Sequence, residues 1–174
     1  SQGVENYDVN TDATTQEMRT YVCAQCHVEY YFAGDEKTLT FPWKNGLTAQ
    51  DAIDYYDEVG WVDFTHTQTG SEVLKAQHPD FETWSQGTHA ANGVTCADCH
   101  MAYEREGAAK VSNHNVNSQM LNESTINSSC LTCHGSTATE MQERVDTIQQ
   151  RWYDAQDISF AAFDALVSDV TEAV

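Results

Sequence analysis

The pentapeptide "CAQCH", at residues Cys23 to His27, is the most informative part of this sequence. It holds two cysteines separated by two residues, with a histidine directly behind the second one. The same pattern returns as "CADCH" at residues 96–100 and as "CLTCH" at residues 130–134. The three copies use all six cysteines of the chain, which indicates one repeated chemical purpose.

The C-x-x-C-H pattern is the attachment signature of haem c. Two thiols about one helical turn apart bond to the two vinyl groups of one porphyrin, and the adjoining imidazole binds its iron. Zinc is the competing interpretation, but a closed site needs two C-x-x-C pairs, and three pairs that each end in histidine fit this poorly. A disulfide across two residues would be strained. The sequence therefore predicts three covalent haem c groups, held by Cys23, Cys26, His27, Cys96, Cys99, His100, Cys130, Cys133 and His134.

The composition agrees with a cofactor-rich protein outside the cytoplasm. A mean hydropathy of −0.55 is polar for a chain that must bury an ordinary core, so we expect haem to fill the interior. The net charge of −19 argues against nucleic acid and anionic membranes as partners. No window approaches the roughly 20 apolar residues of a membrane span. Because covalent haem c is attached outside the cytoplasm, we expect a periplasmic or otherwise extracytoplasmic protein.

We expect one mainly α multihaem cytochrome c domain over residues 1–174, with long irregular loops. Residues 1–15 are polar and are expected to be flexible. Helices are predicted from Thr15 to Phe32, from the capping box at Thr48 to Gly60, and between Pro79 and Gly87. A long amphipathic helix over 139–174 could break near Asp157. Residues 101–128 are predicted to form an irregular loop between the second and third motifs. No stretch shows a pattern that clearly predicts a β-strand.

Four histidines remain outside the three motifs: His66, His78, His89 and His114. A haem that only carries electrons usually has a second axial side chain, whereas a catalytic haem keeps one face open. Each of the four is therefore a candidate ligand. Met101 and Met120 are weaker alternatives.

Four stretches together resemble one known family. "CAQCHVEYYF", "KAQHPDFETWSQGTH", "VTCADCHM" and "SSCLTCH" are similar to segments of the pentahaem cytochrome c nitrite reductases, which convert nitrite to ammonia. The similarity runs from about Tyr21 to Val170 and covers the portion of that family that carries its last three haem motifs.

The resemblance implies a calcium site behind the first motif. Glu29 would supply carboxylate oxygen and Tyr30 its backbone carbonyl. The Lys75 carbonyl and the Gln77 side-chain oxygen would complete the protein ligands. Hard oxygen ligands of this kind suit calcium.

The resemblance also implies roles around the haems. The Tyr30 hydroxyl and the His78 imidazole would face the open side of the catalytic haem, where His78 would donate hydrogen bonds and protons to nitrite. His89 would be the distal ligand of the haem on Cys130 and Cys133, and His114 that of a haem attached elsewhere. His66 matches no functional position, so we expect a structural role for it.

The chain also departs from the family. The motif C-x-x-C-K or its variant, which holds the catalytic haem, is absent, as are a further C-x-x-C-H motif and the active-site arginine, because Arg19 lies in a different context. Three interpretations follow: a part of a nitrite reductase, a complete triheme electron-transfer cytochrome, or a small enzyme that opens one of its own haems. The first is favoured, because the calcium and pocket residues have no purpose without a catalytic haem. It implies nitrite as substrate, a redox partner cytochrome or quinol-oxidising donor, an additional chain or segment with the catalytic haem, and a homodimer built on the C-terminal helix.

Overall fold

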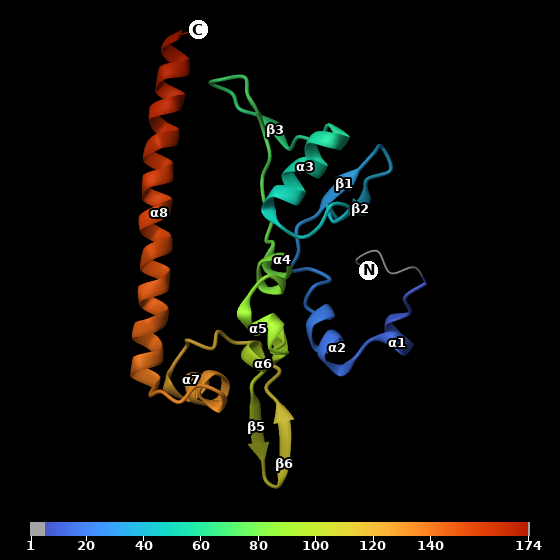
Figure 1. Ribbon diagram of the computed structural model, residues 1–174, viewed down its shortest axis with the longest axis vertical. Helices are drawn as coiled ribbons and strands as arrows, with labels where there is room; N and C mark the ends of the chain where they lie inside the picture. The colour runs from blue at the N-terminus through green and yellow to red at the C-terminus, as the bar shows by residue number, and fades with distance from the viewer. Residues whose placement is uncertain (1–5, 174) are drawn as a thin grey trace. The chain divides into compact units, whose positions relative to one another are not determined.

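The computed structural model describes residues 6–173, which form two units (Figure 1). The first unit comprises the described residues up to Thr65 together with Glu72–Ala97, and the second comprises His66–Ser71 and Asp98 onward. Each unit is described by itself, so the expectation of a single domain over residues 1–174 stays a prediction. Within 6–173, no helix combines the length and the apolar character that a membrane crossing needs.

Short helices and hairpins make up the first unit. In chain order they are α1 (Val9–Asp12), α2 (Thr15–Tyr21), β1 (Tyr31–Ala33), β2 (Thr38–Thr40), α3 (Ala49–Val59), β3 (Phe64–Thr65), β4 (Glu72–Val73), α4 (Asp80–Ser85) and α5 (Thr88–Ala91). The expectation of a flexible start falls partly on residues 1–5, which lie outside the described range.

The helix predicted from Thr15 to Phe32 is much shorter than expected. Thr14 and Glu17 form a capping box, and α2 already ends at Tyr21. The first haem motif follows in successive turns, and Tyr31 then begins strand β1 opposite Thr40. The prediction was wrong because the aromatic residues behind the motif favour an extended, half-buried strand over a helix.

Helix α3 behaves as the sequence predicts. Thr48 and Asp51 form the capping box, and Gly60 ends the helix in the left-handed conformation at φ 65°. Its residues Tyr55 and Tyr56 pack edge-to-face on Tyr31, which joins α3 to the β1–β2 hairpin (Figure 1). These three tyrosines are the core of the first unit.

The short helix predicted behind Pro79 is also confirmed. Pro79 occupies the N-cap of α4, which ends at Ser85. Gly87 does not simply end this helix, because it caps the next one, α5.

Helix α6 (Cys96–His100) carries the second haem motif and leads into the second unit. That unit continues with β5 (Tyr103–Glu106), β6 (Ala109–Ser112), α7 (Glu123–Ser129), the 3-10 turn η1 (Cys130–Thr132) and α8 (Ala138–Ala173). The expectation of irregular structure over 101–128 is therefore wrong for the β5–β6 hairpin and for α7, and it holds for residues 113–122. The three hairpins of the described chain escaped notice because strands of two to four residues are too short to show a periodic pattern.

Helix α8 is continuous, so the break allowed near Asp157 does not occur. Met141 is its buried residue, near α7. Farther along, Ile148, Trp152 and Leu166 are more than half exposed, although they belong to the predicted apolar face. The long C-terminal helix and the mainly α character are confirmed.

The tyrosine core makes the stability of the first unit sensitive to alkali. Burial, with a smaller contribution from the hydrogen bond to Tyr55, raises the pKa of Tyr31 to about 12 from 10.0. Because the folded-state pKa is the higher one, the neutral phenol stabilises the fold fully below about pH 10, and this stability is lost as the pH rises toward about 12.

We therefore expect Tyr31→Phe to flatten the loss of stability between about pH 10 and 12. Denaturant titrations at several pH values, followed by the fluorescence of Trp61, whose ring lies 4.7 Å from that of Tyr31, measure this. Tyr153→Phe, at an exposed tyrosine of α8, is the control and should keep the wild-type pH profile. An unchanged profile in Tyr31→Phe would contradict the assignment.

Candidate functional site

The residues behind the first haem motif alternate between two sides of the chain. Glu29 and Tyr31 are buried, Tyr30 is half-buried and Phe32 is exposed. Successive side chains of an extended backbone point to opposite faces. The Tyr30 and Phe32 rings accordingly meet with centroids 5.8 Å apart, while Glu29 and Tyr31 both contact Tyr56. Residues 29–32 thus contribute side chains to two different surfaces.

Glu29 is a buried carboxylate with only 6% of its surface exposed. The Tyr56 hydroxyl donates to its Oε1 at 2.9 Å, and the Gln77 backbone N–H donates to its Oε2 at 2.6 Å. Burial, and then the bond to Glu29, raises the pKa of Tyr56 far above its ordinary value, so the phenol stays a donor. The Gln77 bond joins segments that are 48 residues apart.

A second buried carboxylate, Glu82 on α4, lies next to Glu29. Its Oε1 accepts from the Glu29 backbone N–H at 3.0 Å and from the Trp43 indole N–H at 2.7 Å. Its Oε2 is buried and has no hydrogen-bond partner among the residues described. Sequence reasoning missed Glu82, because nothing in "HPDFETW" separates a buried glutamate from a solvated one.

Glu29 and Glu82 both line a cavity of about 590 Å³ whose walls also include Trp43, Tyr56 and Lys75. An unpaired buried polar atom costs roughly 1–3 kcal/mol, and more when it is charged. Two carboxylates at one cavity, one with a free oxygen, form a donor set that suits a hard cation.

The calcium ligands predicted from the resemblance lie on two segments, residues 29–30 and residues 75–77, which the Gln77–Glu29 hydrogen bond connects. Gln77 is held against Glu29, and Lys75 is held by its backbone N–H, which donates to Asp63 Oδ2 at 2.7 Å. Tyr30 follows Glu29 directly. The donor chemistry fits calcium, while the ligand set itself stays a prediction.

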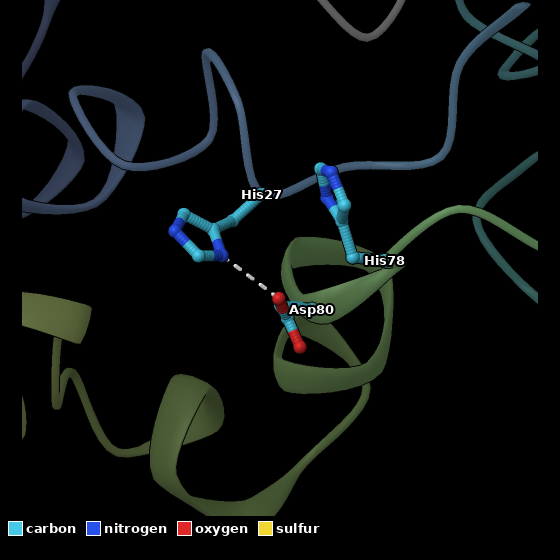
Figure 2. A group of neighbouring side chains, drawn as sticks. All are labelled: His27, His78 and Asp80. Carbon is cyan, nitrogen blue, oxygen red and sulfur yellow. Dashed lines mark hydrogen bonds and ion pairs between the residues drawn. The ribbon is translucent and has the colours of Figure 1, made fainter. Parts of the chain in front are cut away.

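On the side of residues 29–32 that faces away from Glu29, the two predicted pocket residues, Tyr30 and His78, lie near each other. The Tyr30 and His78 ring centroids are 5.9 Å apart, and those of His78 and His27 are 5.7 Å apart. Figure 2 shows His27 and His78 side by side above the start of α4. His78 is exposed, so its imidazole is accessible to a small ligand.

The start of α4 holds His27 at two points. The Phe81 backbone N–H donates to the His27 carbonyl at 3.0 Å, and His27 Nδ1 lies 2.9 Å from Asp80 Oδ2 (Figure 2). Asp80 was not among the residues singled out by sequence. His27, His78 and Asp80 also form a cluster of possible metal ligands. Within residues 6–173, they are the one group of at least three His, Cys, Asp or Glu side chains whose ligand atoms all lie within 4.8 Å of one another.

All three haem motifs have the local geometry that attachment requires. In the first and third, the histidine N–H donates to the carbonyl of the leading cysteine at 3.0 Å, so both thiols and the imidazole sit on one turn. In the second, the same turn is helix α6. All six cysteines are free thiols, and His27, His100 and His134 are exposed. The residues therefore fit covalent haem c.

Within the second unit, Cys99 of the second motif lies near Cys130 of the third. Burial raises the pKa of the Cys99 thiol, and the neighbouring Cys130 raises it further.

The remaining histidines lie apart from this cluster in the chain. His89 is on α5 in the first unit, whereas the Cys130 motif is in the second, so its predicted ligation stays a prediction. His114 is exposed in the turn after β6, and its ligation also stays a prediction. His66 bonds to Thr69 at 3.0 Å and packs on Phe163, which agrees with the structural role expected for it.

Known proteins resemble this chain over most of its length. Cytochrome c-552 of Parabacteroides distasonis is 49% identical over 146 residues, which cover 84% of this chain and 28% of that protein. Cytochrome c-552 of Haemophilus influenzae is 42% identical over 169 residues, or 97% of this chain and 30% of that protein. The chain thus spans less than a third of the length of these relatives.

A solved structure agrees with these relatives. The cytochrome c nitrite reductase of Desulfovibrio desulfuricans matches with a TM-score of 0.75 and 38% identity, over 82% of this chain and 32% of that one. It is described as a catalytic subunit, NrfA, with two calcium sites. This match confirms the predicted fold class of a mainly α multihaem cytochrome c. A family model for cytochrome c552 matches residues 1–174, and the chain therefore belongs to the cytochrome c552 family.

Proposed function

We propose that this chain is part of an ammonia-forming cytochrome c nitrite reductase. It supplies three c-type haems for electron transfer, a calcium site, and the residues on the distal side of the catalytic haem. The similarity to a nitrite reductase catalytic subunit supports this proposal. Because no C-x-x-C-K motif occurs in the 174 residues, an additional chain or segment carries the catalytic haem.

One observation carries the proposal: the hydrogen bond from the Gln77 N–H to Glu29 Oε2, at 2.6 Å. It fixes residues 29–30 against residues 77–78. As a result, Gln77 is held next to Glu29, which lines the cavity, while the rings of Tyr30 and His78 lie near each other. A protein that only transferred electrons would need neither arrangement.

A calcium ion would be held by the Glu29 carboxylate, the Tyr30 and Lys75 carbonyls and the Gln77 side-chain oxygen. A divalent charge there offsets Glu29 and Glu82, which are otherwise two carboxylates buried at one cavity. It also raises the local potential for an anionic substrate in a chain of net charge −19.

At the exposed surface, the protein groups manage hydrogen bonds and protons. A catalytic haem bound beside this surface would supply the iron that binds nitrite and the electrons for its reduction. The His78 imidazole is exposed, and an imidazole there can donate hydrogen bonds and protons to an anion. Tyr30, with its ring 5.9 Å from that of His78, places a second donor at the same opening.

The alternative is a triheme electron-transfer cytochrome derived from the same family, without a catalytic haem. In that case every haem is six-coordinate, and the reduced chain binds neither nitrite nor carbon monoxide. For both functions we propose an extracytoplasmic location and a redox partner cytochrome or quinol-oxidising donor. The exposed apolar residues of α8 are consistent with a homodimer.

The role of His78 is tested in the complete assembly. We expect His78→Asn to lower nitrite reduction at least roughly a hundredfold, the range for loss of a general acid, with unchanged haem content. Turnover with methyl viologen as donor, together with a pyridine haemochrome assay, measures both. His66→Asn is the matched control and should retain full activity. Normal turnover in His78→Asn would contradict the role.

The calcium assignment predicts a separate loss. Glu29→Gln removes the ligand charge and should weaken calcium binding at least roughly 10–100-fold, the cost of losing even an outer-shell partner of a metal site. Isothermal titration of chelator-treated protein measures the affinity. Glu36→Gln, at an exposed glutamate, is the control. Equal affinities in the two variants would exclude Glu29 as a ligand.

The origin of the catalytic haem is tested by intact mass and haem staining of the purified enzyme. We expect a haem-stained species in addition to, or larger than, a 19.4 kDa polypeptide with three haems. Full nitrite-reducing activity from that polypeptide alone would contradict the proposal that the catalytic haem comes from elsewhere.

A further inference from the structure

The exposed carboxylate of Asp80, the first residue of α4, has no part in the function proposed above. We propose that Asp80 is a positioning residue for His27: it orients the axial imidazole of the haem on Cys23 and Cys26 and strengthens it as an iron ligand. The inference rests on haem attachment at the first motif and not on nitrite turnover.

Two hydrogen bonds connect the start of α4 to His27. Asp80 Oδ2 lies 2.9 Å from His27 Nδ1 and bridges positions 53 residues apart in the chain. The next residue, Phe81, donates its N–H to the His27 carbonyl at 3.0 Å. The first turn of α4 therefore holds both the backbone and the ring of His27 (Figure 2). The bond from Phe81 fixes the backbone of His27, and the bond to Asp80 restricts rotation of its ring.

The contact with Asp80 also determines the tautomer of the His27 imidazole. An ionised carboxylate only accepts hydrogen bonds, so the proton of this contact belongs to Nδ1 of His27. The lone pair then remains on Nε2, the nitrogen that faces away from Asp80. Imidazoles that bind metals commonly donate their other N–H to a carboxylate, which fixes the ring and raises its basicity.

The consequence is a change in haem electronics. A more basic imidazole stabilises ferric over ferrous iron, and hydrogen bonding around the axial ligand is one of the means by which proteins set haem potentials. Asp80 therefore lowers the reduction potential of the first haem relative to the same haem without this bond.

Asp80 also lies close to His78, the predicted proton donor of the pocket. The contact with His78, however, runs through the backbone: the Asp80 N–H donates to the His78 carbonyl at 2.7 Å. The side-chain bond goes to His27, so we assign the carboxylate to the haem ligand.

The test uses the haem-loaded full chain and a redox titration followed by electron paramagnetic resonance. Asp80→Asn keeps the size of the side chain but loses its charge, and we expect one haem to shift to a higher midpoint potential with altered g values. Asp80→Glu should restore both toward wild type. Asp54→Asn, at an exposed aspartate of α3, is the matched control and should change neither.

Two results would overturn the proposal. If Asp80→Asn raises the potential but leaves all g values unchanged, Asp80 acts only through its charge and does not orient the ring. If neither quantity changes while three haems are still attached, the bond has no role at the iron. Pyridine haemochrome and far-ultraviolet circular dichroism establish that the haems and the fold are intact in each variant. Nitrite reduction is not a readout, so failure of this inference is separate from failure of the proposed function.

Discussion

The buried carboxylate of Glu29 is the constraint on which the rest of the first unit depends. It accepts from Tyr56 on α3 and from the Gln77 backbone, and its own N–H donates to Glu82 on α4. Three separate segments are thereby tied to a residue two positions after the first haem motif. A buried charge is costly unless its hydrogen bonds are satisfied, so this cluster stabilises one specific arrangement of these segments.

The cluster also explains how a small apolar core can position a site. The first unit buries three tyrosines but leaves large apolar residues such as Phe32 and Leu39 exposed. Polar contacts therefore define the geometry here, and porphyrins attached at the haem motifs would supply apolar surface. The two sides of residues 29–32 then serve different purposes, one facing the buried cavity and one facing His78.

Several features were predictable from the residues, because their causes are local. The haem motifs, the capping box of Thr48 and the end of α3 at Gly60 depend on residues within a few positions of one another. The pairing of "VEYY" with "KAQH" came instead from a family resemblance, and the Gln77–Glu29 bond agrees with it. The predicted extent of the first helix was wrong, because the aromatic residues after the motif favour a strand, in which Tyr31 packs on Tyr55 and Tyr56.

The amino-acid sequence was sufficient for the number of haem motifs, the acidic character and the long C-terminal helix, since each is a property of composition or local spacing. It could not reveal that Glu82 is buried with an unpaired oxygen, or that Asp80 meets His27. Both depend on contacts between residues 53 positions apart, and such contacts exist only once the chain has folded. An exposed and a buried carboxylate look the same in a sequence, because burial is decided by the tertiary structure.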